Sequence, residues 1–140
     1  LRAEGSAHGP WTLTELTTEA SSSGAARALV RLSHADGRSV ERSASGDGPV
    51  DAAFKAIEAA TGIAVVLRKF EVHAVSEGED AQGEARVYVE YNQRTYRGAS
   101  VSTNIVESAT RAFLEVINRI EQTASGARTR AERAAAVTGA

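Results

Sequence analysis

Along most of the chain, apolar and polar residues alternate at the two-residue spacing of a half-buried β-strand. The clearest run covers residues 26–32, where Ala28, Val30 and Leu32 alternate with Arg27 and Arg31. Comparable runs predict six strands in all, near residues 11–16, 26–32, 38–45, 65–77, 85–91 and 94–101. A chain with this pattern folds mainly as β-sheet.

Two segments change to the spacing of an amphipathic helix. Residues 49–61 place four apolar side chains on one face, begin with Pro49 and are followed by Gly62, as helix starts and ends favour. Residues 104–122 carry a second apolar stripe, and Asn104 with Glu107 three residues later forms a variant of the capping box. The sequence therefore predicts one helix after each group of three strands.

The order of three strands and a helix occurs twice. In one alignment of the two halves Arg38 superposes on Arg94, but Val30 superposes on Val87 only when the alignment is moved by one position. This change of alignment requires a bulge or a one-residue shift in the middle strand. Asp36-Gly37 predicts a type I′ hairpin turn, because both residues tolerate positive φ.

The predicted fold is α+β, with two pseudo-repeated βββα units at 11–62 and 63–122. We expect the strands to form a six-stranded antiparallel sheet with helices on one face. Because the other face is left without a helix, the pattern also predicts a homodimer. Residues 1–10 are interpreted as a linker or an expression remnant, and residues 123–140 as a disordered tail or a frayed helix.

Composition narrows the class of protein. Hydrophobic residues make up 42% of the chain and charged residues 24%, the net charge is −2, and no apolar run is long enough to span a membrane. We therefore expect neither a membrane partner nor a nucleic-acid partner, since the basic residues form no stripe. The absence of cysteine excludes disulfides and fits a reducing cytoplasm.

No recognisable catalytic or metal-binding set is present. The three histidines, at positions 8, 34 and 73, lack metal-ligand spacing, and the acidic residues Glu77, Glu79, Asp80 and Glu84 lack the spacing of an EF-hand and are interpreted as a solvated loop. We expect no catalytic residue and no metal ligand in this chain.

The two predicted helix starts are the best candidates for binding. Residues 46–50 and 100–105 each lead a strand into a helix through small or hydroxylic residues, and amides at a helix N-terminus bind carboxylates. Asp47 adds a carboxylate that suits an ammonium group. Ordinary capping is the alternative, but together the two kinds of group match a free amino acid.

Three motifs carry a family resemblance: GDGPVDAAFKAI, FEVHAVSEGEDAQGEARVYVE and VSTNIVESATRAFLEVINRI. From about Trp11 to Ile120 the chain resembles the C-terminal regulatory domain of 2-isopropylmalate synthases. The resemblance implies a dimer of paired βββα units that needs no cofactor of its own. It also implies that leucine, bound between the units near the dimer interface, inhibits an N-terminal catalytic barrel that condenses acetyl-CoA with 2-oxoisovalerate.

The matching motif positions imply a set of leucine-binding residues, namely Gly46, Asp47, Gly48, Val50, Leu67, Phe70, Ala74, Ala81, Gly83 and Val101. Two positions depart from the family pattern. Asn104 replaces the usual aspartate at the second helix start, and Phe70 replaces a common tyrosine. The alternatives are an isoleucine-sensing domain of a citramalate synthase and a dimerisation module that has lost its ligand. A free-standing enzyme is the least favoured interpretation.

Overall fold

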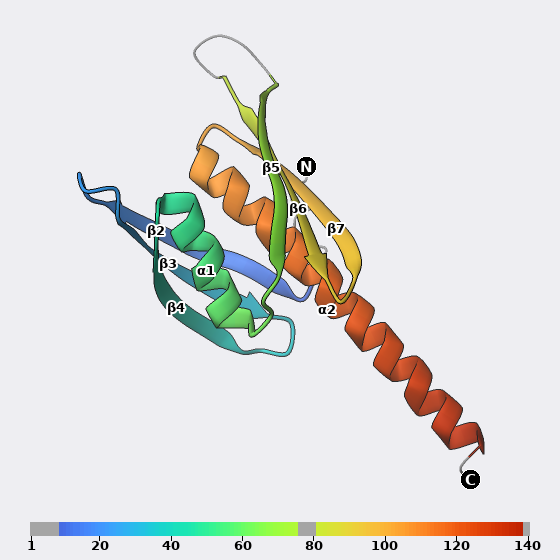
Figure 1. Cartoon of the computed structure of the whole chain (residues 1–140). Coiled ribbons are helices and arrows are strands. Elements are labelled where there is room, and N and C mark those ends of the chain that lie inside the picture. The colour runs from blue at the N-terminus through green and yellow to red at the C-terminus, as the bar shows by residue number, and fades with distance from the viewer. Residues whose placement is uncertain (1–8, 76–80, 139–140) are drawn as a thin grey trace.

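The computed structural model describes residues 9–75 and 81–138, with side chains described up to residue 124. The first unit contains β2 (Trp11–Ala20), β3 (Ala26–His34), β4 (Ser39–Gly46) and α1 (Pro49–Thr61). The second contains β5 (Val66–Ala74), β6 (Gly83–Tyr91), β7 (Arg94–Ser102) and α2 (Ile105–Thr138). This order confirms the predicted α+β fold of two βββα units (Figure 1).

The strands form two antiparallel three-stranded sheets, in the orders β2-β3-β4 and β5-β6-β7, so the expected single six-stranded sheet was wrong. The open edges of β2 and β7 do not pair with each other, because α2 lies between them, and its side chains bond to three of their backbone groups. Asn118 accepts a bond from the Trp11 N–H at 2.8 Å and donates to the Trp11 carbonyl at 2.9 Å. The Glu115 Oε1 atom accepts a bond from the Ala99 N–H at 2.9 Å.

Strand pairing shows how closely the two units repeat. Leu13 pairs with Leu32 in the first sheet, and Leu67 pairs with Val89 at the equivalent place in the second, each immediately before a β-bulge. The middle strands align with Val30 on Val87, as predicted, and the third strands with Arg38 on Arg94. Both first strands therefore contain the same irregularity, which sequence comparison did not locate.

The one-residue shift arises in a hairpin turn. The His34 N–H bonds to the Arg38 carbonyl at 2.9 Å, which leaves residues 35–37 as the turn between β3 and β4. Of these only Gly37 has a positive φ, 100°, so the hairpin is present but the predicted type I′ turn at Asp36-Gly37 was wrong. The two-residue turn with both φ values positive, 52° and 66°, occurs instead at Asn92-Gln93. The additional residue in the first turn accounts for the change of alignment between the middle and third strands, which needs no bulge in the middle strand.

The helices of both units pack into one core. Helix α1 packs on β3 and β4, and α2 packs on β6 and β7 and also on β2. Phe54 of α1 stacks on Phe113 of α2 with 4.2 Å between ring centroids. The two helices run in the same direction, and α2 continues well beyond the sheets to Thr138, through the segment for which the sequence predicts a disordered tail or a frayed helix (Figure 1).

Candidate functional site

The start of α1 leaves backbone donors available to a ligand. Gly48 is the N-cap residue and has no side chain to accept a bond from the first-turn amides. One turn on, the Asp51 carboxylate accepts a bond from the Asp47 N–H at 3.0 Å. This bond lowers the pKa of Asp51, a slight desolvation opposes it, and Lys55 lowers the pKa further. The turn is therefore held by Asp51, while the first-turn amides and the exposed Asp47 side chain lie at its surface.

Gly46 is required by this geometry and Gly48 is not. A Cβ atom on Gly46 would lie 2.5 Å from Asp51 Oδ2 and 2.6 Å from the Ala52 backbone nitrogen, so a side chain there would displace the helix start. Gly48 has extended backbone, with φ −166°, and a Cβ there would meet nothing within 4 Å. The open space beside Gly48 is where a ligand can approach the α1 amides.

The start of α2 is closed by its own side chains. Asn104 Oδ1 accepts a bond from the Glu107 N–H at 3.0 Å, and Ser102 Oγ accepts one from the Asn104 N–H at 3.0 Å. The predicted role of Asn104 as a cap is confirmed. This cap satisfies the Glu107 amide, whereas the first-turn amides of α1, at Val50 and Asp51, have no side-chain cap; Pro49 itself has no N–H to offer.

The inner face of β5 is apolar and uncovered. Leu67, Phe70 and Val72 pair with the buried residues Val89, Val87 and Ala85 and so share their face of the sheet. They nevertheless remain 46%, 37% and 44% exposed, since the two helices pack on the other strands. An exposed apolar strip of this kind is a candidate surface for an apolar ligand or a partner.

The second sheet also shows which residues sequence reasoning missed. Gly83 is buried, and a Cβ atom on it would lie 2.6 Å from Ile105 Cδ1 and 3.5 Å from Val72 Cγ1. The Ile105 side chain therefore occupies the space that the predicted contact residue Gly83 leaves, and it is itself 38% exposed. The β5 alternation could have identified Val72, whereas nothing in the sequence indicated that Ile105 reaches Gly83.

The predicted site residues do not form one cluster within a single chain. Leu67 and Ala74 lie at opposite ends of β5, roughly 20 Å apart at the usual rise per residue, farther than one amino acid extends. Val101 pairs with Glu84 on the opposite face of the sheet from Phe70. Val50 is half-buried against the core, and Ala81 is exposed at the start of the second described segment.

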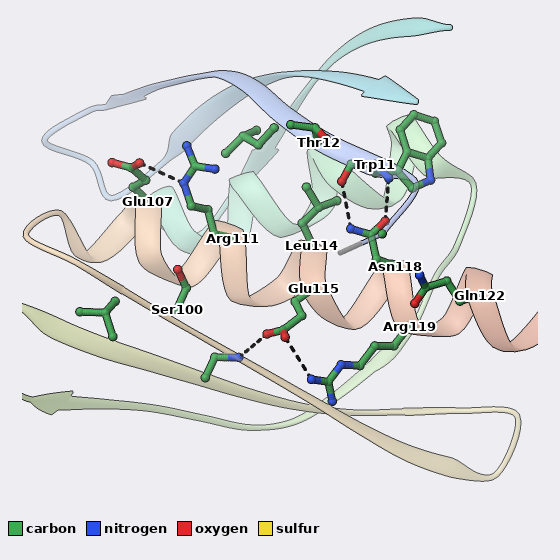
Figure 2. Close-up of a pocket in the computed structure, with 14 residues that line it drawn as sticks. Trp11, Thr12, Ser100, Glu107, Arg111, Leu114, Glu115, Asn118, Arg119 and Gln122 are labelled. Atoms are coloured by element: carbon green, nitrogen blue, oxygen red, sulfur yellow. Dashed lines mark hydrogen bonds and ion pairs between the residues drawn. The ribbon is translucent and has the colours of Figure 1, made fainter. Parts of the chain in front are cut away.

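A groove of about 780 Å³ lies above α2, between the edges of β2 and β7 (Figure 2). Leu13, Val101 and Leu114 give it apolar walls, and the ion pairs Glu107–Arg111 and Glu115–Arg119, each 3.0 Å, run along the helix. Of the ten predicted ligand residues, only Val101 lines this groove.

Other classes of site find little support in the described part of the chain. His34 lies between Glu121, at 2.7 Å, and Asp36, at 3.1 Å, as a structural link between β3 and α2. No group of three potential metal-ligating side chains occurs among the described residues, and neither described helix is both long and apolar enough to cross a membrane. Glu77, Glu79, Asp80 and His8 lie outside the described residues.

The paired βββα units, with an uncapped start of α1 and an uncovered apolar strand β5, define a small α+β module with two candidate binding surfaces. The family model described as the LeuA allosteric (dimerisation) domain matches residues 2–121, and the chain belongs to this family. It is 46% identical over 95 residues to 2-isopropylmalate synthases of Xylella fastidiosa and Stenotrophomonas maltophilia, covering 68% of this chain and 18% of each relative.

A third relative, the 2-isopropylmalate synthase of Rhodopirellula baltica, is 43% identical over 110 residues, covering 79% of this chain and 21% of that protein. The chain thus spans about a fifth of the length of the curated relatives it matches. It corresponds to the dimerisation and regulatory domain of these enzymes, which confirms the resemblance identified from the three motifs.

Proposed function

We propose that this chain is the feedback-regulatory part of a cytoplasmic 2-isopropylmalate synthase. Two copies associate, leucine binds at their interface, and bound leucine inhibits the condensation of acetyl-CoA with 2-oxoisovalerate by an N-terminal catalytic barrel. The family description as an allosteric dimerisation domain and the names of the relatives support this proposal. The domain is expected to need no cofactor of its own.

The observation that carries the proposal is the pairing of unlike groups at the start of α1. Uncapped amides attract the leucine carboxylate, and the exposed Asp47 carboxylate suits the ammonium group. The bare face of β5, with Phe70 and Val72, offers apolar surface to the isobutyl side chain. These features together match an apolar amino acid in its zwitterionic form.

A second copy of the chain would bring together predicted site residues that lie apart within one copy. The uncovered apolar strip on β5 is an association surface that a partner chain would bury. Val101, on the other face of the sheet, would then contribute from a different side of the assembly than Phe70. Inhibition follows if leucine binds one arrangement of domain and barrel more tightly than the other, and substrate then weakens leucine binding by the same factor.

The proposal is tested by thermal unfolding and calorimetry of this chain with leucine, isoleucine and valine. A ligand at about 100 times its dissociation constant adds about 2.7 kcal/mol to the stability of the folded state, which raises the midpoint by several degrees. A leucine-selective shift supports the proposal. An isoleucine-selective shift reassigns the domain to the citramalate synthase branch, and the absence of any shift leaves a dimerisation module without a ligand.

Two variants locate the polar part of the site. Asp47→Ala should weaken leucine binding at least fivefold, because it removes the partner of the ammonium group. Thr103→Ala alters the equivalent position of the second unit, just before α2, and should leave the affinity within twofold. Unchanged leucine affinity in a folded Asp47→Ala protein would remove the α1 turn from the site.

A further inference from the structure

The ring of Phe70 is held by one aromatic contact. Phe70 and Phe54 meet edge to face, with 6.2 Å between ring centroids and 85° between ring planes. Phe70 is otherwise on a strand that the helices leave uncovered. The contact with Phe54 therefore limits how far the Phe70 ring can turn away from α1.

Phe54 is well suited to hold another ring because it is fixed itself. It is buried in α1 and stacks on the buried Phe113 of α2, with 11° between ring planes. The three rings form a continuous bridge from the core of the helix pair to the exposed strand. A displacement of Phe70 would have to break its contact with a ring that the core does not allow to move.

The bridge joins the two units, with Phe54 from the first and Phe70 and Phe113 from the second, and the repeat provides the same three positions once more without a bridge. The strand and helix alignments place Leu16 where Phe70 lies, Thr110 where Phe54 lies and Ile57 where Phe113 lies. The Thr110 hydroxyl bonds to the Val106 carbonyl of its own helix at 2.7 Å. The fold of a βββα unit therefore does not require the aromatic bridge, which occurs only in contact with the uncovered strand.

We propose that Phe54 is a positioning residue for the ligand: it fixes the orientation of Phe70 and thereby determines how well the site distinguishes leucine from isoleucine and valine. This inference rests on the proposed function. In an apolar pocket one methyl group more or less changes binding by only about 10- to 200-fold, so a wall that adapts its shape loses part of this small discrimination. A Phe70 ring released from Phe54 adapts to each side chain and lowers the selectivity.

The test measures dissociation constants of leucine and isoleucine for four forms of this chain: the unaltered chain, Phe54→Leu, Phe70→Leu and the double variant. Phe54→Leu is expected to reduce the ratio of the isoleucine constant to the leucine constant at least threefold. In the Phe70→Leu background the same change should leave the ratio unaltered, because Phe54 acts through Phe70. An undiminished effect of Phe54→Leu in that background overturns the inference.

Ile57→Val is the control, since Ile57 is buried in the same helix as Phe54 and is not part of the aromatic bridge. It should lower the thermal midpoint and keep the selectivity ratio; an equal change of ratio in Ile57→Val would reduce Phe54 to a core residue and overturn the proposal. The ring-current contribution of Phe54 to the Phe70 proton resonances provides a ligand-free measurement of the contact. It should be lost in Phe54→Leu, or in the milder Phe54→Met if the first variant does not fold, and retained in Ile57→Val.

Failure of the proposed function gives a different result from failure of this inference. If the unaltered chain binds none of the three amino acids, both are overturned. If it binds leucine selectively and Phe54→Leu keeps that selectivity, only the positioning role of Phe54 is overturned.

Discussion

The two βββα units of this chain have the same layout but differ at the surfaces that a ligand or partner would use. In the first unit, β2 packs along α2, while its counterpart β5 in the second unit leaves Leu67, Phe70 and Val72 exposed. Helix α1 starts at an uncapped glycine, whereas α2 starts at Asn104, whose side chain caps it. The repeat therefore accounts for the fold, and the departures from it indicate the candidate site.

The largest effect is expected where the second unit brings its sheet closest to its helix. A Cβ atom on Gly98 of β7 would collide with the backbone carbonyl of Ala112 in α2. Because neither backbone can yield without moving the sheet, Gly98→Ala should lower the free energy of unfolding by roughly 3 kcal/mol. Urea unfolding measures the change.

The first unit supplies the control for this variant. Arg42 of β4 lies at the position that corresponds to Gly98 and is exposed. Arg42→Ala should therefore change the free energy of unfolding by less than about 0.5 kcal/mol. A loss in Gly98→Ala as small as that in Arg42→Ala would show that α2 yields to the added methyl group and that this close packing is not required for stability.

The uncovered strand should control association. Val72→Lys places a charge on the apolar strip of β5 and is expected to weaken the dimer at least tenfold, about 1.4 kcal/mol, because the charge must be desolvated in the interface. Thr18→Lys makes the same change at the equivalent position of β2. Sedimentation equilibrium should show weakened association for Val72→Lys only; a dimer that tolerates Val72→Lys excludes β5 from the interface.

The periodicity of the chain was sufficient to predict every strand and helix of the repeat, because apolar spacing reports directly which face each element buries. Alternation along β5 also placed Phe70, Val72 and Ala74 on one face, but Leu67 joins that face only through the bulge between Leu67 and Lys69, which alternation could not locate. It could not predict that no helix covers this face, since that depends on how α1 and α2 pack against each other. Nor could it predict two separate sheets, which result from contacts as distant in sequence as Trp11 and Asn118.

The two helix starts should respond differently in stability when their cap residues are altered. Asn104→Ala removes the cap of α2 and should cost about 1 kcal/mol in stability. Gly48→Ser supplies α1 with a hydroxyl acceptor in open space and should change stability by only a few tenths of a kcal/mol. Thermal unfolding measures both changes.

The same Gly48→Ser variant also tests ligand binding. Its hydroxyl competes with the leucine carboxylate for the α1 amides, so leucine affinity should fall several-fold while folding is preserved. Calorimetry of Gly48→Ser and Asn104→Ala provides the comparison. A larger loss of affinity in a folded Asn104→Ala protein would move the carboxylate site to the start of α2.

The smallest effect concerns the carboxylate that holds the α1 turn. The Asp47 N–H bond lowers the pKa of Asp51 below its value in the unfolded chain, so the folded state is favoured when this group is ionised. This contribution to stability is present above the pKa of the unfolded chain, about 3.9, and is lost as the pH falls through the lower pKa of the folded state. Because the side chain is 43% exposed, solvent screens the interaction and the contribution is small.

Asp51→Asn isolates this contribution, since the amide oxygen can still accept the Asp47 N–H but carries no charge. The variant should be slightly less stable than the unaltered chain at neutral pH, and the difference should shrink as the pH falls below about 4. Thermal midpoints of the two proteins from about pH 3 to about pH 7 measure it. A stability difference that stays constant over this range would show that the turn is held by hydrogen-bond geometry alone, independently of the charge on Asp51.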